Sequence, residues 1–210
     1  MKHIEISVAS FLDQLASGAA TPGGGSAAAV MGAMGAALVS MVANLTLGKQ
    51  KYDEVEGEVK DLLEQSETLR AQLAAVLQDD IRAYDRVMAA YALPKTTDQE
   101  KVARNQAIQA ALKQATEAPL ACARLALEVI PLAKRIAGIG NINAISDGGV
   151  AAIAAQAALR SALLNVFVNT AVIKDKAFCA PCIAEAEQLL AKGAALETEV
   201  FTMVKHKILH

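Results

Sequence analysis

The sequence has few aromatic side chains and few histidines. Its 210 residues contain no tryptophan, and aromatic residues make up 3% of the chain, so a core must be filled by Ala, Leu, Val, Ile and Met. The three histidines lie at positions 3, 206 and 210, near the chain ends. This placement argues against a histidine-based metal site and against a Ser–His–Asp or Cys–His nucleophile.

Several classes of protein are excluded by what is missing. The net charge is −2, whereas a protein that binds duplex nucleic acid normally has a basic face, so we expect no nucleic-acid partner. The first residues lack the apolar run of a signal peptide. Three cysteines, an odd number, do not make a disulfide framework. We therefore expect a cytoplasmic protein.

Charge is absent from residues 14–48, which form 35 consecutive positions without Asp, Glu, Lys, Arg or His. A Thr-Pro-Gly-Gly-Gly-Ser loop at residues 21–26 runs directly into an uncharged helix of small residues, long enough to cross a bilayer. Ala and Gly gain little from lipid, however, and Asn44 and Thr46 interrupt the far end. We therefore expect no membrane partner and a buried helix, packed closely through Gly32, Gly35 and Ala36.

Helical signals cover the chain, and no sustained period-two alternation indicates a strand. The sequence predicts an all-α fold: one domain over residues 1–210, built as a bundle of long antiparallel helices around the buried small-residue helix. The expected helices are residues 10–16, 26–47, 53–93, a segment beginning at residue 98 and broken by prolines, 147–172 and 181–205.

Helix ends have recognisable signals. We expect Ser26 and Ser146 to be N-caps of the two small-residue helices, and Gly48 to mark the end of the first. Residues 97–100, Thr-Asp-Gln-Glu, form a capping-box pattern. Pro119 and Pro131 are expected to kink or break the helix that contains them.

Asp80 is the ionisable residue with the clearest reason for an unusual pKa. It lies at helical spacing in an apolar seam made of Leu73, Leu77, Tyr84 and Val87, whereas Asp79 falls off that face and should be solvated. Loss of water would raise the pKa of Asp80 and suit it to general acid–base chemistry. The alternative is a structural aspartate that caps or bridges a neighbouring helix.

Two glycine-rich loops each precede a small-residue helix. The first, formed by Gly23, Gly24, Gly25 and Ser26, has backbone N–H groups that suit an anion or a polar ring edge. The second contains Asn143, Ser146 and Asp147. Each can also be read as a simple helix entry with no function. We hypothesise that the two loops face one crevice.

The cysteines are interpreted as structural. Cys179 and Cys182 have the spacing of a redox motif, but no strand precedes them, and a zinc site would need further ligands beyond Cys122. We expect no metal.

Short motifs along nearly the whole chain resemble the formiminotetrahydrofolate cyclodeaminase/methenyltetrahydrofolate cyclohydrolase family. They come in the family's order, at residues 22–26 (PGGGS), 34–38 (MGAAL), 44–49 (NLTLGK), 80–84 (DIRAY), 93–95 (LPK), 118–120 (APL), 140–141 (GN), 146–147 (SD), 150–152 (VAA) and 165–166 (NV). The chain length is similar to that of stand-alone bacterial cyclohydrolases of the serine cycle. Cys179 and Cys182 are no part of the family pattern.

This resemblance implies an all-α homodimer that acts on a one-carbon tetrahydrofolate without metal or other cofactor. It also implies that Asp80 matches the family's catalytic acid. The expected reaction is hydrolysis of 5,10-methenyltetrahydrofolate to 10-formyltetrahydrofolate. The alternatives are a cyclodeaminase that releases ammonia from a formimino substrate, and a folate-binding helical dimer without catalysis.

The remaining site residues receive roles in substrate binding. The N–H groups of residues 24–26, together with Asn143 and Asp147, are expected to hold the pterin or orient water. Lys49 and Lys51 are expected to attract the acidic glutamate tail of the folate, although both also suit a solvated helix end.

Overall fold

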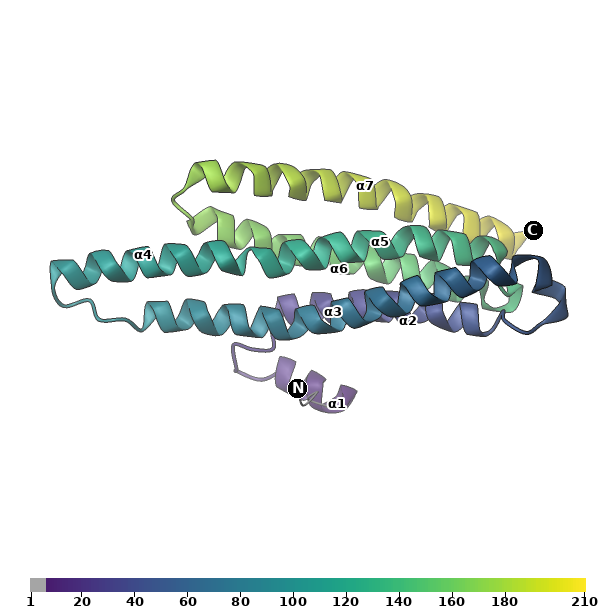
Figure 1. Ribbon diagram of the computed structural model, residues 1–210, viewed down its shortest axis with the longest axis horizontal. Helices are drawn as coiled ribbons and strands as arrows, with labels where there is room; N and C mark the ends of the chain where they lie inside the picture. Colours follow the sequence, from purple (N-terminus) through teal and green to yellow (C-terminus); the bar gives the residue numbers. More distant parts are fainter. Residues whose placement is uncertain (1–6) are drawn as a thin grey trace.

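Long helices lie side by side along one axis, and a short helix stands apart from them (Figure 1). The computed structural model describes residues 7–210, and this part of the chain contains no β-strand. The all-α prediction is therefore confirmed. In chain order the elements are α1 (Val8–Leu15), α2 (Gly24–Asn44), the 3-10 turn η1 (Gln50–Val55), α3 (Glu56–Tyr91), α4 (Asp98–Ala115), α5 (Glu117–Ile139), the 3-10 turn η2 (Ile142–Ala144), α6 (Ile145–Val172) and α7 (Lys176–Leu209).

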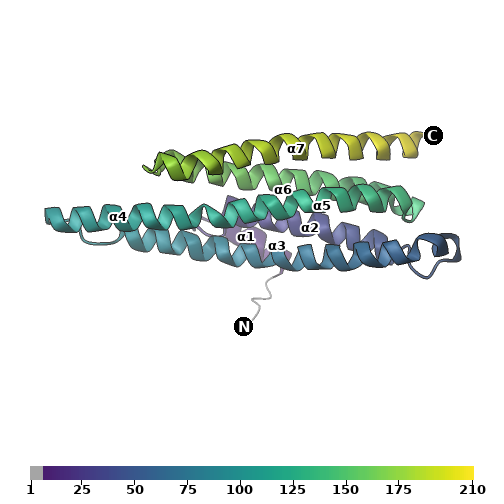
Figure 2. The ribbon, with the colours of Figure 1, turned by 45° about the horizontal axis from the view of Figure 1, so that its top comes forward.

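The uncharged helix α2 packs between α3, α5 and α6. A Cβ atom on Gly32 would lie 2.9 Å from Cδ2 of Leu73 in α3, and one on Gly35 would lie 2.9 Å from the carbonyl oxygen of Ala151 in α6. Glycine at these positions lets the neighbouring helices approach closely. Gly32, Gly35 and Ala36 are all buried, as predicted. Helix α7 covers α5 and α6 on the side away from α3 (Figure 2).

Two helical segments are long and apolar enough to meet a length and hydropathy criterion for membrane spans. The segments Gly24–Asn44 and Ile142–Val172 both pass it, but 56% and 50% of their most apolar windows are buried inside the bundle. Packing against other helices therefore accounts for a large part of their apolar surface.

Some predicted helix ends are confirmed. The capping box forms, because the Thr97 hydroxyl accepts a hydrogen bond from the Glu100 N–H at 3.2 Å, and the Glu100 carboxylate accepts one from the Thr97 N–H at 2.9 Å. Gly48 has a φ of +70°, in the left-handed region that favours glycine, although it follows the helix end by several residues. These signals work because every atom involved is local in sequence.

The two predicted serine caps are wrong. Helix α2 begins two residues before Ser26, with Gly23 at the N-cap, so that Ser26 lies inside the first turn. Helix α6 begins at Ile145, directly after η2, and Ala144 occupies the N-cap in place of Ser146. At α2 the helix starts after Gly23, and at α6 it starts directly after the 3-10 turn η2, so each helix begins before its serine.

The break expected near Pro119 is confirmed, whereas the helix is not broken at Pro131. Helix α4 ends at Ala115 and α5 begins at Glu117, so Pro119 lies in the first turn of α5, where a missing N–H costs little. Pro131 lies inside α5, which continues to Ile139. The flanking Ile130 and Ala133 are fully buried, and we attribute the continuity of the helix to their packing. Helix α7 likewise begins before Pro181, at an N-cap formed by Asp175.

A matched pair of glycine substitutions tests the close packing of α2. Gly35→Ala should lower the free energy of unfolding by about 1–3 kcal/mol, the usual cost of overpacking, because the new methyl group meets backbone that cannot move aside. Gly57→Ala, an exposed helical position with nothing within 4 Å of its Cβ, should leave stability unchanged or slightly higher. Urea denaturation measures both, and equal stability of the two variants would contradict the packing argument.

Candidate functional site

Asp80 lies on the side of α3 that faces the bundle. The fully buried positions of α3 on either side of it include Leu73, Val76 and Ala83. Asp80 itself is half-buried, and the carboxylate therefore sits where the apolar seam meets solvent. Beyond it the buried face continues through Ala83 and Ala90, and Tyr84, which the predicted seam included, is 37% exposed. The predicted position of Asp80 on an apolar face is thus confirmed.

The first turn of α2 forms the wall opposite this carboxylate. The Ser26 hydroxyl donates a hydrogen bond to Oδ2 of Asp80 at 3.0 Å, and Ser26 is fully buried. A Cβ atom on Gly25 would lie 2.6 Å from Cγ of Asp80, which is too close for any side chain. Gly25 and Ser26 therefore position the carboxylate: one leaves room for it and the other fixes its orientation.

Burial raises the pKa of Asp80 above its ordinary value, and the hydrogen bonds from Ser26 oppose that rise. No charged neighbour contributes to the shift. The adjacent Asp79 is exposed and forms an ion pair with Arg82 at 3.4 Å, so its predicted solvation is confirmed. Of two consecutive carboxylates, only Asp80 has the environment of a proton-transfer group.

Cys122 of α5 lies close enough to Asp80 for the charge of the carboxylate to affect its thiol. Burial, with a smaller contribution from the negative charge of Asp80, raises the pKa of its thiol to about 12. The thiol is therefore protonated and neutral at physiological pH. All three cysteines are free, with Cys122 and Cys179 buried and Cys182 half-buried. Within residues 7–210 no cluster of three or more His, Cys, Asp or Glu side chains forms a potential metal site.

The second glycine-rich loop lies at the opposite end of α2. Its Asn141 N–H donates to the Thr46 hydroxyl at 2.8 Å, and its side-chain amide donates to the Leu45 carbonyl at 2.8 Å. Both acceptors directly follow the C-terminus of α2. Because a helix of 21 residues is about 30 Å long, the two loops are separated by that distance. The hypothesis that both loops of one chain face one crevice is therefore wrong.

The four remaining predicted binding residues gather at this distant end, and we call them the far-end group: Lys49, Asn143, Ser146 and Asp147. Lys49, Asn143 and Ser146 are exposed, and Asp147 is half-buried. Tyr52 connects the two segments, since its hydroxyl accepts a hydrogen bond from the Ile142 N–H at 3.1 Å. Within one chain the far-end group is assembled, but it does not reach Asp80.

Two contributors to these regions, Cys122 and Thr46, were not predicted, and Ser26 was predicted to bind substrate but not to contact Asp80. Ser26 and Cys122 lie near Asp80 on other helices, 54 and 42 positions away in the sequence, and Thr46 holds the second loop. No local pattern identifies such contacts. The uncharged character of residues 14–48 is the one usable signal, because it indicates that α2 lies against whatever polar group the core contains.

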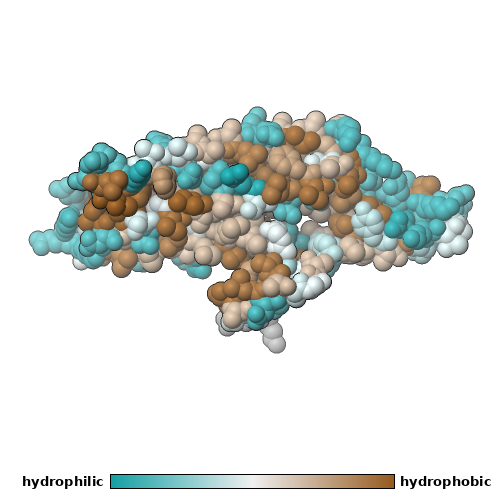
Figure 3. Space-filling view, turned by 180° about the vertical axis from the view of Figure 1, so that it is seen from behind, coloured by the Kyte–Doolittle hydropathy of each residue, from teal (hydrophilic) through white to brown (hydrophobic). Residues whose placement is uncertain are grey.

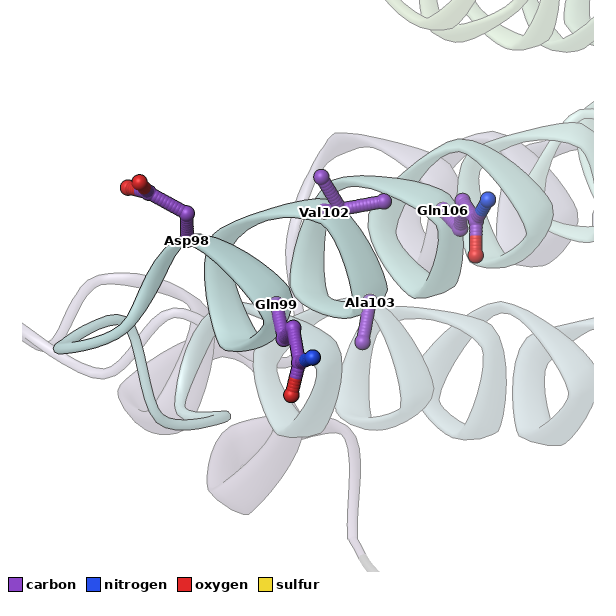
Figure 4. A pocket seen from close by; sticks show the side chains of 5 residues that line it. All are labelled: Asp98, Gln99, Val102, Ala103 and Gln106. Atoms are coloured by element: carbon purple, nitrogen blue, oxygen red, sulfur yellow. The ribbon is translucent and has the colours of Figure 1, made fainter.

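A surface depression of about 400 Å³ at the start of α4 contains no residue of this site in its lining (Figure 4). The five residues that line it, Asp98, Gln99, Val102, Ala103 and Gln106, all belong to α4. With no second element to form an opposite wall, this is the surface of one helix and offers no converging set of catalytic groups.

Comparison with known proteins identifies relatives over nearly the full length. Residues 7–188 match the family model described as "Formiminotransferase-cyclodeaminase". The chain is 56% identical to a methenyltetrahydrofolate cyclohydrolase of Methylorubrum extorquens, over 96% of this chain and 97% of the relative. It is 34% identical to the formimidoyltransferase-cyclodeaminase of Rattus norvegicus over 83% of this chain, which corresponds to 32% of that longer protein.

A solved structure agrees with the fold. The crystal structure of formiminotetrahydrofolate cyclodeaminase from Thermotoga maritima superposes with a TM-score of 0.86, covers 97% of this chain and 98% of the other, and is 31% identical in sequence. Similarity of sequence and of structure therefore extends across the whole bundle.

The Ser26–Asp80 hydrogen bond can be tested directly by titration. Ser26→Ala should raise the pKa of Asp80 further, because the substitution removes a donor that stabilises the carboxylate. Carbon-13 NMR of the aspartate carboxyls measures the value, and the Asp80 signal is assigned by its absence from Asp80→Asn. An unchanged or lower pKa in Ser26→Ala would contradict the geometry.

The raised pKa also has a consequence for stability. The folded carboxyl holds its proton more tightly than the unfolded one, whose pKa is about 3.9, so the folded state is favoured at low pH and this contribution is lost as pH rises through the folded pKa. Relative to wild type, Asp80→Asn should therefore gain stability as pH increases above about 4. Urea midpoints across pH measure this difference, and a constant difference would contradict it.

Proposed function

The chain belongs to the formiminotransferase-cyclodeaminase family, and on this basis we propose that it hydrolyses 5,10-methenyltetrahydrofolate to 10-formyltetrahydrofolate. Similarity to the Methylorubrum extorquens cyclohydrolase over 97% of that protein supports this reaction in particular. The structural observation that carries the proposal is Asp80, a half-buried carboxylate with a raised pKa that is oriented by Ser26. We assign Asp80 as the general acid and base.

The chemistry needs one group that can both accept and deliver a proton. The carbon that bridges N5 and N10 in the substrate is electrophilic and carries positive charge. As water adds to this carbon, Asp80 accepts a proton from the water, which leaves a hydroxylated tetrahedral adduct. The bond from the carbon to N5 then breaks as Asp80 returns its proton to N5, and the hydroxyl proton passes to solvent. The formyl group remains on N10.

The surroundings of Asp80 suit a cationic substrate. The charge-free helix α2 and the neutral thiol of Cys122 place no positive charge against the carboxylate. A substrate cation therefore has no competitor for Asp80, and its attraction to the carboxylate is strengthened by partial burial. Water is the only co-reactant in this scheme, so we propose that the enzyme uses no metal and no other cofactor.

We retain Gly23 and Gly24 as substrate-binding residues. Gly24 is exposed at the first turn of α2, and nothing lies within 4 Å of its Cβ position, so its backbone remains accessible to a pterin. Gly25 and Ser26 face Asp80, and we propose that they act mainly by positioning the carboxylate. Their expected role in direct substrate binding becomes secondary.

We propose that the enzyme works as a homodimer in the cytoplasm. A two-fold pairing of antiparallel α2 helices would bring the far-end group of one chain next to Asp80 of the other, and so give Lys49, Asn143, Ser146 and Asp147 access to substrate. In that arrangement Lys49 attracts the glutamate tail, while Asn143 and Asp147 hold the pterin. The separation of about 30 Å within one chain is the reason for requiring a second copy.

Formiminotetrahydrofolate cyclodeaminase activity is the second candidate. It is supported by the Thermotoga maritima structure, which matches 97% of this chain. The same Asp80 would protonate ammonia as it leaves a formimino substrate. Release of ammonia from 5-formiminotetrahydrofolate distinguishes this reaction, and a protein that binds folate without turnover in either assay would be a non-catalytic folate-binding dimer.

Two adjacent aspartates provide a matched test of the mechanism. Asp80→Asn should reduce hydrolysis to the spontaneous rate, with helical content and folate binding retained. Asp79→Asn, which changes an exposed carboxylate paired with Arg82, should keep turnover within about twofold of wild type, because exposed pairs contribute little. Loss of the methenyltetrahydrofolate absorbance measures both variants. Undiminished turnover by Asp80→Asn would remove Asp80 from the mechanism.

A further inference from the structure

Helix α1 has an apolar face that the described part of the chain covers only in part, with Phe11 and Leu15 half-buried. Val8, Phe11, Leu12 and Leu15 recur at the three- and four-residue spacing of one helix face. Val8 is 77% exposed and Leu12 is 54% exposed, and no residue of α1 is fully buried. The ribbon shows α1 standing away from the bundle (Figure 1).

A helix of this kind needs a surface to dock on. Isolated helices shorter than about 12–15 residues are marginal in water, and α1 has eight residues. The cap contributed by the Ser7 side chain, which accepts a hydrogen bond from the Ser10 N–H at 3.1 Å, stabilises it only slightly. Exposure of the apolar face would add a further cost.

A second uncovered apolar surface lies on the bundle itself. The α2–α6 face consists of the exposed side chains Met34, Met41, Val150, Ile153, Leu164 and Val168. The rear view of the molecule shows hydrophobic colour over the middle of this side and over the projecting α1 (Figure 3). Helix α2 carries no charge, and α6 carries only Asp147 and Arg160. Exposed apolar side chains that gather on one side of a protein in this way are typical of an interaction site.

The position of α1 in the chain connects it to the site. After Leu15 only eight residues separate α1 from Gly24, where α2 begins and where Gly25 and Ser26 contact Asp80. Eight connecting residues span at most about 26–29 Å, so the surface on which α1 docks lies within that reach of the start of α2.

We infer that α1 is an arm that packs its apolar face on the α2–α6 face of a second copy of this chain. The exchange is reciprocal, as two-fold symmetry requires, and it holds the partner next to Asp80. The inference rests on the proposed homodimeric hydrolase. It adds a physical link between the two properties, because the segment that secures the dimer continues directly into the wall of the catalytic site.

The composition of α1 favours a protein surface over a lipid surface. Helices that lie on membranes are typically rich in Lys and Arg on their polar face, which binds anionic lipid headgroups. The polar side of α1 contains Ser10, Asp13 and Gln14 and no basic residue. The α2–α6 face in the same protein provides exposed apolar side chains for this contact.

Paired charge substitutions on the two faces of α1 test the arm. Val8→Asp with Leu12→Asp places two carboxylates on the apolar face, and Ala9→Asp with Gln14→Asp places the same two charges on the solvent face. By analytical ultracentrifugation the first pair should raise the dimer dissociation constant at least tenfold, and the control pair should leave it within about twofold, since exposed charges interact weakly in water. Circular dichroism should show the same helical bundle in all three proteins.

The link to the active site gives a second readout. Upon dilution, the specific activity of the apolar-face variant should fall at protein concentrations where wild type and control remain active, and it should recover at high protein concentration. Identical dissociation constants for wild type and both variants would contradict the packing of α1 on a second copy. A weaker dimer whose activity does not depend on protein concentration would contradict the dependence of the active site on that packing.

A crosslinking experiment identifies the surface on which α1 packs. Benzoylphenylalanine is placed at Leu12 in unlabelled chains, which are mixed with nitrogen-15-labelled chains and irradiated. Crosslinks between light and heavy peptides of α2 or α6 support the arm. Crosslinks within one chain only would overturn it, as would a protein that binds vesicles of phosphatidylcholine and phosphatidylglycerol through α1 while remaining monomeric. Absence of hydrolysis by wild type would contradict the proposed function. It would not affect the crosslinking result, which reports only where α1 packs.

Discussion

The close contact between the first turn of α2 and the carboxylate of Asp80 is the constraint on which the candidate site depends. It requires glycine at position 25, a hydroxyl at Ser26, and a helix that can lie against α3 without charged side chains of its own. Gly32 and Gly35 allow this close packing, because their lack of a side chain brings α2 against α3 and α6 further along the same helix. The packing of small residues and the chemistry of the carboxylate are thus two results of one arrangement. A larger residue at either place would move the helix away from the Asp80 carboxylate.

Local signals in the sequence were sufficient for most of the fold. The capping box at Thr97 and Glu100 and the long apolar periodicities predicted real helices, since the atoms that make these structures are neighbours in the chain. The predictions that failed were those in which packing or an earlier start decided the outcome. Ser26 was expected to cap its own helix, but it donates to a residue 54 positions away. Pro131 was expected to disrupt α5, but both of its flanks are anchored in the core.

The environment of Asp80 was predictable from the sequence, but the positions of the other predicted site residues relative to it were not. Asp80 could be identified because an ionisable residue on an apolar seam is unusual, and the structure places it at the edge of the core. The second loop could not be placed by its similarity to the first, because resemblance between two helix entries contains no information on distance. The length of α2 does contain that information: its 21 residues separate the two loops by about 30 Å. Oligomerisation, which no local pattern specifies, is the step that would reunite them.

Helix α2 fixes the spacing and the relative orientation of the residues that contact Asp80 and α6. One residue inserted within it would rotate one end by about 100° relative to the other and shift it by about 1.5 Å. Gly25 would then no longer face Asp80 while Gly35 still faced Ala151, so both contacts could not be kept. An insertion between Gly25 and Gly35 would therefore break one of the two contacts. The number of residues between these two glycines is set by contacts that must be satisfied at once.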